Sequence, residues 1–138
     1  MSVNPYQKYK NAQYETASPE QLLLMLYNGA IKFAGQARTA LEEKNIEVAN
    51  NKLKKTQDVI NELMVSLDLD QGGEIASNLY SLYEYMNRRL IQANIRKDPK
   101  IVDEVVGLLS EIKESWEEVI TKMRQGTIQS AGGLNIEG

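Results

Sequence analysis

At 138 residues, with 42% hydrophobic and 25% charged side chains, the chain is long enough for one globular domain with its own core. Its formal net charge of −3 argues against nucleic acid as the main partner, because phosphate binding requires a basic face. The sequence has neither histidine nor cysteine, which removes disulfides, thiolate chemistry, the commonest general base and the commonest transition-metal ligand. We therefore expect no cofactor and no metal site.

The N-terminal residues 1–17 are polar but contain three tyrosines, Tyr6, Tyr9 and Tyr14. Tyr6 and Tyr9 are three positions apart and would share one face of a short helix. The segment could be a frayed terminus, but disordered tails rarely carry aromatic residues at this density, so we predict a short helical cap that packs onto the bundle. The segment shows no apolar run behind a basic start, so no signal peptide is expected.

The first long helix is predicted over residues 19–43. Ser18, Pro19 and Gln21 form a helix start, with a capping hydroxyl, a proline at the first position and a capping-box partner. The apolar residues that follow spread over roughly 200° of the helix, whereas a surface helix needs only a little over 100°. The surplus suggests that something besides the core lies against this helix.

A second helix is predicted over residues 46–67, capped by Asn45. Its apolar seam is narrow, about 100°, so Leu53 and Leu63 are interpreted as structural. The segment 68–73, DLDQGG, is predicted to be a loop because two adjacent glycines break the backbone.

A third helix is predicted over residues 74–94 and a fourth over residues 99–124, where Asp98 and Pro99 repeat the cap-and-proline start. Both have apolar arcs wider than a bundle core requires. The core-facing seams end at Leu67 in the second helix and include Ile75, Leu79 and Leu90 in the third and Trp116 in the fourth. The last residues, 125–138, are glycine-rich and aperiodic, which predicts a disordered tail.

These elements predict an all-α fold, an antiparallel up-down four-helix bundle with an N-terminal cap and a disordered tail. The expected divisions are a cap at 1–17, a bundle domain at 18–124 and a tail at 125–138. No run of about 18 apolar residues occurs, so we expect a cytoplasmic protein that does not insert into a membrane.

No active site is evident from the sequence. No nucleophile can be paired with a histidine or cysteine base, and no glycine-rich phosphate loop is present. An enzyme that uses Glu74 or Glu84 is disfavoured because neither carboxylate has an evident partner to tune its pKa. The basic cluster Lys52, Lys54 and Lys55 is interpreted as a solvated helix face.

The surplus apolar surface has two interpretations. A thick bundle, or the N-terminal cap, could cover it; alternatively it forms a groove for an amphipathic helix of a partner. Tyr27, Tyr80 and Tyr83 favour the groove because tyrosine suits surfaces that are partly dry and partly wet.

Specific sequence blocks resemble the flagellar secretion chaperone FliS family. They are NPYQKY, TASPEQLLLMLYNGAIKF, GGEIASNLYSLYEYMNRRLIQANIRKD and VVGLLSEIKESW, in that order, within residues 4–120. The blocks SP-x-QL-x-x-MLY-x-GA and GGEIA-x-NL-x-x-LY-x-Y are the most specific. Residues after Arg124 carry no resemblance.

The resemblance implies a cytosolic chaperone that binds the C-terminal disordered segment of flagellin. Family members prevent premature polymerisation and deliver flagellin to the flagellar type III export apparatus. It also implies that an N-terminal aromatic-x-x-Tyr element, here Tyr6 and Tyr9, contacts the export-gate membrane protein. The alternative function is a helical-bundle adaptor or regulator that binds a different amphipathic helical partner.

Candidate flagellin contacts lie on the flanks of the wide arcs, where each residue could instead belong to the core. They are Leu23, Tyr27, Ile31, Ala76, Tyr80, Tyr83, Ile91 and Val106.

Overall fold

The computed structural model describes residues 17–132, and these fold into four helices. The helices are α2 (Pro19–Glu42), α3 (Ile46–Val65), α4 (Leu69–Arg96) and α5 (Pro99–Gly132). No strand occurs within this range. The predicted all-α fold is confirmed.

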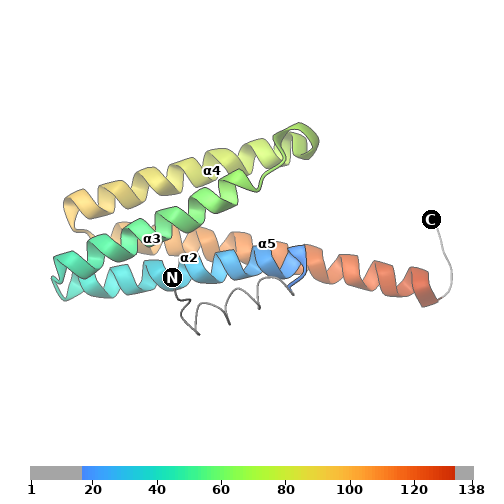
Figure 1. Cartoon of the computed structure of the whole chain (residues 1–138), viewed down its shortest axis with the longest axis horizontal. Coiled ribbons are helices and arrows are strands. Elements are labelled where there is room, and N and C mark those ends of the chain that lie inside the picture. Colours follow the sequence, from blue (N-terminus) through green and yellow to red (C-terminus); the bar gives the residue numbers. More distant parts are fainter. Residues whose placement is uncertain (1–16, 133–138) are drawn as a thin grey trace, which may run out of the picture.

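The helices form an up-down-up-down ring in which each packs against two neighbours (Figure 1). α2 contacts α3 and α5, and α4 also contacts α3 and α5, so α2 and α4 lie diagonally opposite. Short connections make sequential helices antiparallel, as the sequence predicted.

Three predicted helix starts are present. At Ser18 the capping box is complete: the backbone N–H of Gln21 donates to Ser18 Oγ at 3.2 Å, and the backbone N–H of Ser18 donates to Gln21 Oε1 at 3.0 Å. Asn45 Oδ1 accepts from the Val48 amide at 3.3 Å, which caps α3. Asp98 Oδ1 accepts from the Lys100 amide at 2.9 Å at the start of α5.

The connection between α3 and α4 differs from the predicted loop. Asp68 caps a helical turn by accepting from the Gln71 amide, so α4 already begins at Leu69. The backbone breaks at Gly73 alone, with φ 58° and ψ −137°, a conformation that only glycine adopts readily. A side chain at Gly72 would also collide with Ala76, because an added Cβ would lie 2.5 Å from the Ala76 Cβ.

The core is built around the small residues of α2. Ala30, Ala34 and Ala37 are completely buried, and their small size lets α3 and α5 approach the α2 backbone closely. Larger side chains from the other helices fill the remaining space. Leu53 and Leu63 are 2% and 1% exposed, which confirms their predicted structural role.

The C-terminal boundary requires a correction. The fourth helix was predicted to end near Arg124, but α5 continues to Gly132 and extends past the other helices (Figure 1). Residues 125–132 are therefore helical, because a helix with a packed N-terminal half can continue through residues that have no apolar period of their own. The predicted cap residues Tyr6, Tyr9 and Tyr14, and residues 133–138, lie outside the described residues.

Candidate functional site

One end of the bundle has an apolar pocket of about 400 Å³, here called the end pocket. It lies where the start of α2, the α3–α4 connection and the middle of α5 come together. Its lining is mainly apolar: Leu23, Ser66, Leu67, Asp68, Gly72, Ile75, Ala76, Leu79 and Trp116. A pocket of this size and character is suited to large aliphatic or aromatic side chains of a partner.

Apolar side chains continue beyond the rim of the end pocket into solvent. Ile75 lines the pocket and is 71% exposed, while Val65 and Leu69 beside the α3–α4 connection are 80% and 50% exposed. Leu69 and Ile75 lie on either side of the backbone break at Gly73, so the start of α4 is not one continuous helix here. Exposed apolar side chains next to an apolar pocket are typical of interaction sites, which makes this end of the bundle the candidate functional site.

A buried hydrogen-bonded chain lies beneath the end pocket. The indole N–H of Trp116 donates to the Tyr27 hydroxyl at 3.2 Å, and the Tyr27 and Tyr83 hydroxyls share a hydrogen bond. Burial raises the pKa of both phenols above the ordinary value for tyrosine. The chain joins α5, α2 and α4, and thus connects the two helices that lie diagonally opposite.

The structure places the predicted contact residues in four different environments, of which the buried core holds Tyr27 and Tyr83. Leu23 and Ala76 line the end pocket. Ile31 and Val106 are half-buried against the core, Tyr80 on α4 is half-buried, and Ile91 on α4 is 49% exposed. The export-gate residues Tyr6 and Tyr9 lie outside the described residues.

Tyr27 and Tyr83 require a correction. They were predicted on a binding face, but they are 0% and 1% exposed and belong to the core. Each hydroxyl finds a hydrogen-bond partner inside the bundle, which removes the main cost of burying a phenol.

Sequence reasoning missed most of the pocket lining. Leu67, Leu79 and Trp116 were assigned to the core seams of their helices, and Ile75 to the seam of α4. For Leu67, Ile75 and Leu79, the position at the end of a seam and close to two consecutive glycines is the signal that could have identified them; Trp116, in the middle of α5, has no such signal.

Two of the ion pairs among the described residues join neighbouring helices. Arg38 pairs with Asp103 between α2 and α5. Glu104 on α5 accepts from Arg89 at 2.7 Å and from Tyr85 at 2.5 Å, and these bonds lower the Glu104 pKa. Between residues 17 and 132 no cluster of three metal-ligating side chains is found, and no helix has the length and hydropathy needed to cross a membrane.

Comparisons with known proteins agree on one family. The family model "Flagellar protein FliS" matches residues 2–123. The chain is 37% identical over 129 residues to the flagellar secretion chaperone FliS of Bacillus subtilis, covering 94% of this chain and 96% of that protein. It is 45% identical over 108 residues to the one of Salmonella typhimurium, with coverages of 78% and 80%. For Vibrio cholerae the identity is 34% over 132 residues, with coverages of 95% and 97%.

Proposed function

The chain belongs to the FliS family of flagellar secretion chaperones, and we propose that it holds the C-terminal segment of flagellin through the end pocket. Bound in this way, flagellin is kept from polymerising in the cytosol and is delivered to the flagellar export apparatus. A chaperone needs no catalytic group for this role; it needs an apolar surface that a client can enter and leave.

The observation that carries the proposal is the end pocket with its exposed apolar rim. An amphipathic helix can place one or two large side chains against Leu23, Leu79 and Trp116, while its neighbouring apolar residues cover Ile75. This buries surface on both partners that would otherwise contact water.

Release of the client also follows from the chemistry. A disordered segment that folds on binding loses conformational entropy, which offsets part of the gross interaction energy and keeps the complex reversible. Ile31, Tyr80, Ile91 and Val106 stay proposals for a longer client path along the bundle. Tyr6 and Tyr9 stay proposals for the contact with the export gate.

Trp116 offers a direct test because it is the single tryptophan of the chain and lines the end pocket. Adding a peptide with the C-terminal segment of flagellin from the same organism should change its emission. Helical circular dichroism should exceed the sum of the separate spectra, and calorimetry should show a negative heat-capacity change. Additive spectra with unchanged emission would contradict the proposal.

Substitutions on the rim locate the site. Ile75→Glu should weaken peptide binding about tenfold or more, because a charge would have to be buried in the interface. Ile46→Glu, an exposed isoleucine at the other end of the bundle, makes the same change and should have no effect. Ile91→Glu reports whether the client path extends along α4. Equal losses for Ile75→Glu and Ile46→Glu would exclude the end pocket as the binding site.

A further inference from the structure

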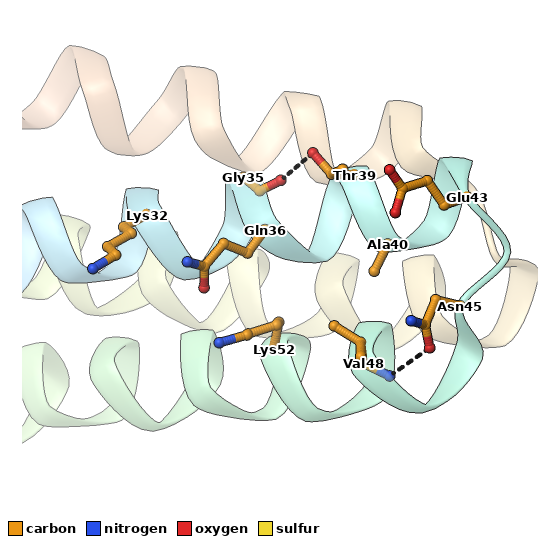
Figure 2. A pocket seen from close by; sticks show the side chains of 9 residues that line it. All are labelled: Lys32, Gly35, Gln36, Thr39, Ala40, Glu43, Asn45, Val48 and Lys52. Carbon is orange, nitrogen blue, oxygen red and sulfur yellow. Dashed lines mark hydrogen bonds between the residues drawn. The ribbon is translucent and has the colours of Figure 1, made fainter.

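The outer groove between α2 and α3 contains a group of positive charges that the chaperone role leaves unexplained. A shallow pocket of about 530 Å³ lies there, lined by Lys32, Gly35, Gln36, Thr39, Ala40, Glu43, Asn45, Val48 and Lys52 (Figure 2). Lys32 and Lys52 lie toward one end of this pocket, and Glu43 lies at the other. We call the Lys32 end, with the adjacent Phe33 and Lys55, the basic groove.

Two lysines of the basic groove converge on one aromatic ring. The Lys52 Nζ is 5.5 Å and the Lys55 Nζ 5.6 Å from the centroid of the Phe33 ring. Both contacts are in the cation–π range, so the ring holds two like charges near each other. The four ion pairs found within the part of the chain that the structure describes involve other cations, so no carboxylate neutralises either lysine.

An unsatisfied acceptor lies in the same groove. The Gln36 side chain reaches from α2 toward α3, and its Oε1 is buried without a hydrogen-bond partner among the described residues (Figure 2). A buried acceptor without a donor is unfavourable. A ligand that completes the groove therefore needs an anionic group for the lysines and a donor for Gln36.

We propose that the basic groove docks an acidic segment of a second protein. An aspartate or glutamate side chain would lie among Lys32, Lys52 and Lys55. Because Gln36 Oε1 is closed to solvent in the free chain, the Gln36 amide would turn outward on binding and accept from a backbone N–H of the same segment. A polypeptide supplies both groups in one strand of chain. Nucleic acid fits less well, because the protein has a net charge of −3 and three lysines make only a short basic track.

The basic groove and the end pocket face different directions. Leu23 lines the end pocket and Lys32 the basic groove, and these residues are nine positions apart on α2. At about 100° per residue they lie on opposite sides of the helix. The acidic segment can therefore bind while the end pocket is occupied, and the proposal does not rest on the flagellin assignment.

Two single-copy aromatic residues make the two sites separately observable. Phe33 is the single phenylalanine of the chain, so labelling with 4-fluorophenylalanine gives one fluorine resonance, located in the basic groove. Titration of the full chain with acetyl-(Glu-Gly)₆-amide at low salt should shift this resonance and leave Trp116 emission unchanged. The matching Gln-Gly and Lys-Gly peptides should shift neither.

Charge substitutions supply the matched control. Lys52→Gln with Lys55→Gln should weaken binding of the glutamate peptide by about fivefold or more. Lys54→Gln with Lys100→Gln removes the same charge from exposed lysines that contact neither Phe33 nor Gln36, and should weaken it much less.

Several outcomes would overturn the proposal. They are an unshifted fluorine resonance, equal losses in the two double variants, a Trp116 response to the glutamate peptide, or tighter binding of a short DNA duplex than of the peptide. A flagellin peptide that fails to change Trp116 emission would instead contradict the proposed function and leave the basic groove unaffected.

Discussion

The two ends of the bundle differ in how completely their core-facing apolar residues are covered, although Ile46 and Ile95, which are 47% and 76% exposed, also lie at the end where α2 finishes. At the end where α2 finishes and α5 starts, every helix contributes residues that are 5% exposed or less: Ala37, Ala40, Leu41, Ala49, Leu53, Leu90, Ala93, Ile101, Val102 and Val105. At the opposite end Leu23, Leu79 and Trp116 are only partly buried, and Ile75 is 71% exposed. We call these the closed half and the open end.

This difference places the residues that stabilise the fold and those that could bind a partner at different positions along the bundle axis. The buried residues of the closed half pack like the interior of any small domain and contribute to the folding free energy. The open end leaves apolar surface available, and its cost is tolerable because the closed half compensates for it. Substitutions in the closed half should therefore lower the stability of the fold, and so should substitutions in the buried layer, by which we mean Tyr27 and Tyr83 beneath the end pocket. Substitutions at the open end should instead lower client binding.

The largest loss is expected for Tyr27→Ala, which tests whether the buried layer belongs to the core. Removing a fully buried aromatic ring should cost about 3–5 kcal/mol of unfolding free energy in urea titrations, and it also leaves the Trp116 indole without its acceptor. Tyr80→Ala, at a half-buried tyrosine of α4, should cost about 1 kcal/mol or less. If both variants lost a similarly small unfolding free energy, Tyr27 would not be a core residue and would again be a candidate for the binding surface.

A leucine pair compares the two regions directly. Leu53→Ala in the closed half should cost about 2–5 kcal/mol through a cavity and leave flagellin-peptide affinity unchanged in the folded protein. Leu23→Ala at the open end should lower the unfolding free energy by about 1 kcal/mol and weaken binding of the flagellin peptide. Urea unfolding and Trp116 titration measure the two effects, and a reversed pattern would end the distinction between the regions.

Local signals in the sequence were sufficient for the helix starts and for the narrow seam of α3. Ser18, Asn45 and Asp98 act within three residues of themselves, so their capping role requires no tertiary information. Leu53 and Leu63 follow one stripe, which can only face the core.

The candidate site was harder to predict because the helical period shows on which side of the helix a residue lies, but not where it lies along the bundle axis. Ile75 and Leu90 both belong to the predicted seam of α4, yet Ile75 is 71% exposed and Leu90 is fully buried. The burial of Tyr27 depends on the partner Tyr83, which is 56 positions away in the chain. Such a pairing is a property of the assembled bundle.

Gly73 tests how the open end is kept open. Its backbone conformation, φ 58° and ψ −137°, is unfavourable for any residue with a Cβ. Gly73→Ala should cost about 1–3 kcal/mol or straighten the first turn of α4, which would displace Ile75 and weaken flagellin-peptide binding. Gly107→Ala provides the control, because a Cβ there meets no atom within 4 Å. Unchanged stability and affinity in Gly73→Ala would show that the break does not shape the pocket.

The smallest expected effect is on the unfolding free energy at alkaline pH. It tests how completely water is excluded from the buried layer beneath the end pocket. Burial raises the pKa of Tyr83 above its ordinary value near 10, since ionisation inside the bundle is unfavourable. A phenol whose folded pKa is raised contributes stability that is complete below pH 10 and is lost as the pH rises above it. Tyr83→Phe should lower the unfolding free energy at neutral pH by about 1 kcal/mol, because the Tyr27 hydroxyl loses one partner but keeps the Trp116 indole. The variant should then lose less stability than the parent between about pH 9 and pH 11, so that the two curves converge. Parallel curves would mean that Tyr83 ionises as easily in the folded chain as in the unfolded one, and the layer would then belong to the open end.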